Sequence, residues 1–171
     1  MYITVITILR VLHIVGSVAW IGGGMFLVNV VFPTVKEAGP DGGKFMQAVG
    51  RSGRLSRLFA ISAVTTFLSG LVLYGMMRYD RALMTGSLAA ITLTIGAGLG
   101  LLAFLHGIFG SGAAANRSAA LAKEIAARNA PPTPEQVQLG QTLAGENMRH
   151  GMISMVLGGL ALLFMAAAQT I

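Results

Sequence analysis

The chain has 171 residues, of which 54% are hydrophobic and only 11% charged, with a mean hydropathy of +0.73. A typical soluble domain is roughly 25% charged, so this chain has too little polar surface to cover itself in water. Cysteine is absent, which excludes disulfides, thiolate metal ligands and thiol catalysis. The net charge of +6 does not indicate nucleic-acid binding, because the basic residues cluster at predicted helix ends on one side, where lipid headgroups explain them.

Four apolar stretches are long enough to cross a hydrocarbon core about 30 Å thick, which takes roughly 20 residues. They cover approximately residues 3–32, 58–77, 83–109 and 151–168. The first is not a secretion signal, because it lacks a basic start before Arg10 and its apolar run is about twice as long as that of a signal. The sequence predicts an all-α integral membrane protein, a four-helix bundle in a single domain.

The loop after the first span begins with turn residues. Residues 39–43 read Gly-Pro-Asp-Gly-Gly, a cluster that favours a turn over a long helix. We expect only a short amphipathic helix from about Lys44 onward.

The segment between the third and fourth spans is predicted to be a helical hairpin over about residues 113–149. Its first arm is rich in alanine, with Leu121 and Ile125 four residues apart, and prolines follow it. The second arm begins with Thr133 as the cap, Pro134 at the first helical position and Gln136 placed to complete a capping box. Nothing interrupts this helix before Ala168, so spans three and four are predicted to extend beyond the bilayer.

The distribution of basic residues predicts the orientation. Nine of the twelve Lys and Arg residues lie in the loop after the first span or in the hairpin, which share one side of the membrane. By the positive-inside rule this side is cytoplasmic, so both termini are expected outside, and we expect the inner (plasma) membrane of a bacterium. The nine residues are Lys36, Lys44, Arg51, Arg54, Arg57, Arg117, Lys123, Arg128 and Arg149.

The first span carries the strongest candidate ligand. His13, Ser17, Trp20 and Gly24 follow one another at spacings of four, three and four, so they share one helix face, which we expect to look into the bundle. A histidine inside a span is costly unless it is paired, so His13 is either a ligand or hydrogen-bonded to a neighbouring helix. Arg10, one turn earlier, either neutralises an acid such as a haem propionate or snorkels to the outer headgroups.

The second and third spans carry small and polar residues. Gly96 and Gly100 form a GxxxG pair, which lets another helix approach closely. The second span has a polar stripe that we interpret as interhelical hydrogen bonding, with space for a flat cofactor as the alternative. The stripe comprises Ser62, Thr65, Thr66, Ser69 and Gly70.

Two further histidines lie near the cytoplasmic ends of the third and fourth spans. Because these spans are antiparallel, His106 and His150 are predicted at similar depth, either as ligands of one metal or one haem, or as solvated or hydrogen-bonded side chains. At 1.5 Å per residue, His13 lies more than about 15 Å away in depth, which favours two sites, or one site and one structural histidine, over a three-histidine centre. None of the six Asp and Glu residues lies inside a predicted span, so a buried proton relay is not expected and no catalytic residue is assigned.

The segment 9–23, with the sequence LRVLHIVGSVAWIGG, resembles the first helix of the HemJ-type protoporphyrinogen oxidase family and of the CopD copper-resistance membrane family. The resemblance to the HemJ type implies that His13 is an axial ligand of b-type haem, and His106 falls near a late third-helix histidine of that family. The functional lysine of that family at the start of the third helix has no counterpart here. The CopD-like resemblance instead implies a copper path through His13 and the methionines.

We therefore expect a b-type haem protein that serves electron transfer or a porphyrin-linked oxidation; whether it is an enzyme, a membrane oxidoreductase, is left open. His13, His106 and His150 are the candidate ligands, with Arg10 and Trp20 beside the cofactor. The alternatives are a copper-handling transporter and a cofactor-free accessory subunit of a larger membrane complex. For the oligomeric state, the close-packing glycines suggest a homodimer as one arrangement.

Overall fold

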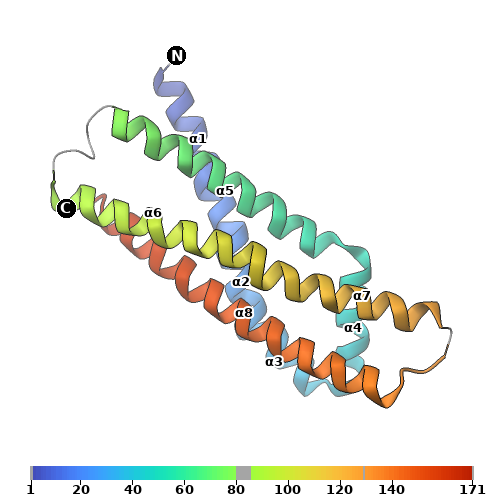
Figure 1. Ribbon diagram of the computed structural model, residues 1–171. Coiled ribbons are helices and arrows are strands. Elements are labelled where there is room, and N and C mark those ends of the chain that lie inside the picture. The colour runs from blue at the N-terminus through green and yellow to red at the C-terminus, as the bar shows by residue number, and fades with distance from the viewer. Residues whose placement is uncertain (1, 80–85, 129, 171) are drawn as a thin grey trace.

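The computed structural model describes residues 2–79, 86–128 and 130–170, which are mainly helical and contain no strand (Figure 1). Four helical segments are long and apolar enough to cross a membrane, so the prediction of an all-α, four-helix integral membrane protein is confirmed. The predicted start of the third span at residue 83 lies outside the described residues. The four segments are Ile3–Glu37, Arg54–Met77, Leu88–Ala127 and Pro134–Ala167.

The first segment is continuous but not uniformly α-helical. Two π-helical stretches separate its α-helical parts, and a π turn accommodates one extra residue. Residues on either side of each π-helical stretch therefore do not share the helix face that regular α-helical spacing would give them. In chain order the parts are α1 (Tyr2–Ser17), η1 (Val18–Gly22), α2 (Gly23–Phe26), η2 (Leu27–Val31) and α3 (Phe32–Glu37).

The next helix, α4 (Gly39–Ser52), corrects the sequence-based expectation of a turn over residues 39–43. Gly39 has φ of +56°, which turns the chain sharply after α3. Pro40 then occupies the first turn, where its missing N–H has no helical partner to lose, and Asp41 is favourable at the positive end of the helix dipole. These turn residues therefore begin the helix instead of preventing it.

The membrane-crossing helices form two antiparallel pairs. Helix α5 (Arg54–Tyr79) packs mainly against α1, and α8 (Pro134–Ala167) packs along the continuous helix formed by α6 (Leu88–His106), η4 (Gly107–Gly112) and α7 (Ala113–Ala127). Figure 1 shows the second pair side by side over most of its length. Each pair consists of segments that are consecutive spans in the chain.

Small residues bring the paired helices together. A β-carbon on Gly16 of α1 would lie 2.5 Å from Oγ1 of Thr66 on α5. Between α6 and α8, a β-carbon on Gly96 would lie 3.0 Å from Cγ of Met165, and Gly100 also faces this side chain. The prediction that the GxxxG pair permits close helix approach is therefore confirmed.

The start of α8 forms the predicted capping box. Thr133 Oγ1 accepts the Gln136 backbone N–H at 3.3 Å, and Gln136 Oε1 accepts the Thr133 backbone N–H at 3.1 Å. Gln136 Nε2 also donates to Glu124 of α7 at 2.8 Å, which ties the two arms of the hairpin together. Residues 134–167 then continue as one helix, as expected.

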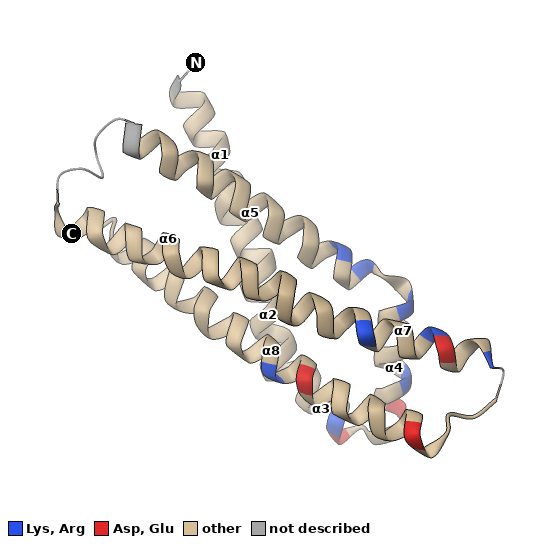
Figure 2. Cartoon of the chain, in the orientation of Figure 1, with Lys and Arg blue, Asp and Glu red and all other residues tan. Residues whose placement is uncertain are grey.

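Charged residues gather at one end of the bundle, over α3, α4, the start of α5, α7 and the first part of α8 (Figure 2). Within this end, Arg117 pairs with Glu146 at 2.7 Å, and Asn147 donates to Ser118 Oγ at 2.8 Å. These bonds join α7 to α8 through polar contacts, whereas the glycines join α6 to α8 through apolar ones.

Candidate functional site

His13 lies in the interface between α1 and α5. Its Nδ1 atom is 2.8 Å from the backbone carbonyl oxygen of Thr66. A carbonyl oxygen only accepts hydrogen bonds, so Nδ1 carries the proton and, in the neutral ring, Nε2 keeps its lone pair. Within the described residues, Nε2 makes no hydrogen bond of its own, and the side chain is half-buried. His13 is therefore oriented by a neighbouring helix and presents one free nitrogen.

The residues around this ring are small and polar. A β-carbon on Gly70 would lie 2.6 Å from Cε1 of His13, so only glycine leaves space for the imidazole there. Ser69 Oγ is 3.5 Å from Nδ1, while Ser17 Oγ donates to the His13 carbonyl oxygen at 2.7 Å. Oγ1 of Thr66 is buried and has no hydrogen-bond partner among the described residues.

The hydroxyls of the polar stripe on α5, which we expected to bond to other helices, donate mainly within α5 itself. The hydroxyls of Ser62 and Ser69 donate to carbonyl oxygens of α5 itself, one turn earlier. Among the described residues, only the contacts to His13 link this stripe to another helix by hydrogen bonds. The stripe is buried at Ser62, Thr66 and Ser69, and it serves chiefly to give α1 a close and polar partner.

Arg10 and Trp20 are placed away from one another on the first segment. Arg10 is exposed and forms no ion pair in the part of the chain that the structure describes. Trp20 is half-buried and meets Phe104 of α6 edge to face at 6.2 Å between centroids, and Phe104 in turn stacks on Phe67 of α5 at 4.2 Å. These aromatic rings join three of the membrane-crossing segments.

The expected single face through His13, Ser17, Trp20 and Gly24 does not extend to its last member. Ser17 is buried, but a β-carbon on Gly24 would meet nothing within 4 Å. The reason is the π-helical stretch η1, whose extra residue rotates the residues after it out of register.

His106 and His150 form a pair between the end of α6 and α8. His106 Nε2 and His150 Nδ1 are 3.3 Å apart, and the ring centroids are 5.1 Å apart with the planes tilted by 43°. The prediction that antiparallel spans bring these two residues to similar depth is therefore confirmed. Their action as ligands stays a prediction.

The three histidines lie at two separate locations in the fold. His13 contacts α5, whereas the pair lies between α6 and α8. The described residues contain no group of three or more His, Asp or Glu side chains that could hold a metal ion. This agrees with the expectation of separate sites over a three-histidine centre.

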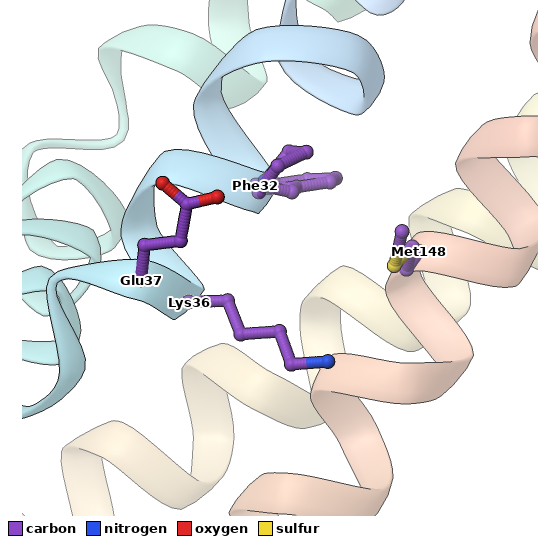
Figure 3. Close-up of a pocket in the computed structure, with 5 residues that line it drawn as sticks. Phe32, Lys36, Glu37 and Met148 are labelled. Atoms are coloured by element: carbon purple, nitrogen blue, oxygen red, sulfur yellow. The ribbon is translucent and has the colours of Figure 1, made fainter.

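A cleft of about 510 Å³ lies elsewhere, between α3 and α8. In Figure 3, Lys36 extends from α3 toward α8, and Met148 faces it from the opposite wall. Its lining is mainly apolar apart from Lys36 and Glu37, and it includes no histidine. Sequence reasoning did not identify this cleft, because it depends on how α3 and α8 lie relative to one another in the fold. The lining residues are Phe32, Pro33, Lys36, Glu37 and Met148.

Comparison of the chain with protein-family models, with curated proteins and with solved structures finds no match. The resemblance of residues 9–23 to the HemJ-type and CopD families therefore stays a prediction.

Proposed function

We propose that the chain is a membrane protein that binds b-type haem through Nε2 of His13 and serves electron transfer or a porphyrin-linked oxidation. The observation that supports this most is the 2.8 Å contact between Nδ1 of His13 and the carbonyl oxygen of Thr66. Histidines that ligate a metal commonly donate their other ring N–H to a carbonyl or carboxylate, which fixes the tautomer and makes the ligating nitrogen more basic. The contact with the Thr66 carbonyl oxygen gives His13 this arrangement.

The surroundings of His13 also fit such a role. Gly70 leaves space for the ring, and its replacement by any residue with a side chain would displace the imidazole. Arg10, exposed about one turn earlier on the same helix, is the cation that would face a propionate. Haem supplies the redox chemistry when bound, and the chain contributes the ligand, its orientation and an apolar environment, which together set the reduction potential.

The proposed location is the inner membrane of a bacterium with both termini outside. The charged end in Figure 2 supports this, because the positive-inside rule assigns a Lys- and Arg-rich end to the cytoplasm. The helix Leu88–Ala127 has 40 residues, or about 60 Å at 1.5 Å per residue, roughly twice the thickness of a hydrocarbon core. We therefore place α7 and the first half of α8 in the cytoplasm as a helical extension.

The visible spectrum of the purified protein tests the function. We expect a Soret band and a sharp α-band on reduction, both lost in His13→Gly and restored when imidazole is added to that variant. Met165→Ala serves as the control, because Met165 packs against α6 at the other helix pair and should leave the spectrum unchanged.

The other outcomes distinguish the alternative functions. Bound copper without a Soret band would support copper handling, and neither copper nor haem would support a cofactor-free accessory subunit. A Soret band that persists unchanged in His13→Gly would contradict the ligand assignment. Gel filtration of each variant in detergent shows whether the fold is retained.

A further inference from the structure

We infer that His106 and His150 form a second site, separate from His13, that binds one divalent transition-metal ion between α6 and α8. The inference does not depend on haem binding, because the pair and His13 contact different helices. The distance between the two ring nitrogens that face one another supports this site.

That distance is the one expected for two ligands of a single ion. Metal–imidazole bonds are about 2.0–2.1 Å long, so two nitrogens at a tetrahedral angle lie about 3.3–3.4 Å apart. The observed distance between His106 Nε2 and His150 Nδ1 is 3.3 Å. Two axial ligands on opposite sides of a haem iron would be about 4 Å apart with a porphyrin between them, so the pair suits a single ion better than a haem.

The backbone beside the pair leaves space for both rings. A β-carbon on Gly110 would lie 2.8 Å from His150 Nδ1 and 3.0 Å from His106 Cε1. Gly110 belongs to η4, the π-helical stretch that begins directly after His106. Such local departures from the α-helix are frequent at functional sites, because they reposition side chains at a cost to regular hydrogen bonding.

Two serine hydroxyl groups on the same helical segments are candidate oxygen ligands. Ser154 follows His150 by one turn on α8, and its Oγ lies 3.2 Å from Oγ of Ser111 in η4. Since the described residues provide no third imidazole or carboxylate here, serine oxygens or water would complete the coordination. Two imidazoles with oxygen ligands suit Zn²⁺, Co²⁺ and Cu²⁺.

Ion binding requires no net change in the protonation of the pair. The 3.3 Å contact between the two facing nitrogens fits a hydrogen bond in which one neutral ring donates its N–H to the other. When this proton moves to the far nitrogen of the same ring, both rings remain neutral and both facing nitrogens present lone pairs to the ion. The alternative role of the pair is an imidazole–imidazole hydrogen bond that only joins the helices.

Cobalt binding separates these two roles. The protein, purified in detergent without a polyhistidine tag and treated with a chelator, is titrated with Co²⁺ alone. We expect one Co²⁺ per chain with the visible absorption of tetrahedral cobalt, displaced by Zn²⁺. His106→Gln and His150→Gln should each weaken binding at least tenfold, whereas His13→Gln should leave it unchanged.

Gly110→Ala provides a variant that keeps both histidines. Its β-carbon would occupy the space beside the rings, so Co²⁺ binding should weaken, whereas Gly98→Ala on α6, where a β-carbon meets nothing within 4 Å, should not affect it. The inference is overturned if the folded wild-type protein binds no Co²⁺, or if binding survives in the His106→Gln/His150→Gln double variant. Loss of the Soret band in the His13 variant with Co²⁺ binding intact would show that the two proposals are independent.

Discussion

Gly70 on α5 lies against the imidazole of His13 on α1, so closely that a β-carbon at this position would be 2.6 Å from Cε1 and 2.8 Å from Nδ1. The ring is thus positioned by two features of the same helix, a carbonyl oxygen that accepts a hydrogen bond from its Nδ1–H and a glycine that leaves it space. Any change at Gly70 acts on the candidate ligand directly.

Gly70→Ala is expected to destabilise the protein by about 1–3 kcal/mol, the usual cost of overpacking, because the added carbon displaces His13 from α5. Unfolding in detergent measured by circular dichroism gives this difference. Gly75→Ala is the matched control on the same helix, since a β-carbon there meets nothing within 4 Å. Alanine is also the better helix former, so equal loss of stability in both variants would contradict the proposed contact.

Gly96→Ala should weaken the other helix pair. Its β-carbon would lie 3.1 Å from the backbone nitrogen of Met165 and 3.2 Å from the carbonyl oxygen of Ala161, and backbone atoms cannot move aside as a side chain can. We expect a loss of about 1–3 kcal/mol in the same unfolding assay. Gly98→Ala, two residues away on an exposed face, should be neutral or slightly stabilising. A neutral Gly96→Ala would show that α6 and α8 are not in close contact.

Phe104→Ala should remove the contact that joins three segments. The variant loses the edge-to-face contact with Trp20 and the stacked contact with Phe67. Each such pair contributes about 0.5–1.5 kcal/mol, so we expect about 1–3 kcal/mol of destabilisation and a change in tryptophan fluorescence. Phe109→Ala is the control, because this ring is 75% exposed. Unchanged Trp20 emission in Phe104→Ala would rule out the contact.

The orientation of the chain can be tested by labelling single cysteines, because the sequence contains none of its own. Ala126→Cys places a thiol at the exposed end of α7, and Gln169→Cys places one near the C-terminus. In bacterial spheroplasts, a membrane-impermeant maleimide should label the thiol at position 169 at once and the thiol at position 126 only after lysis. The opposite pattern would place the termini in the cytoplasm.

The spans and the His106–His150 pair could be predicted because they depend on simple rules. Length and apolarity define a span. In antiparallel neighbouring helices of known length, residues at similar depth lie close to one another. The start of α8 was also predictable, since the capping box uses local residues alone.

Other features depend on interactions that sequence patterns do not specify. The extra residue in η1 changes which side of the helix Gly24 occupies, and no local residue indicates it. The start of α4 at Gly39 was missed because one left-handed glycine turned a sequence typical of loops into a helix start. The helix that His13 contacts could not be predicted, because apolar periodicity does not reveal which helix lies opposite.

The pairing of α1 with α5, and of α6–η4–α7 with α8, has a consequence for biogenesis. Each pair consists of consecutive spans, so a hairpin can leave the translocon and close on itself before the next one is synthesised. Two polypeptides, divided between α5 and α6, would then be expected to complement one another when produced together in one cell.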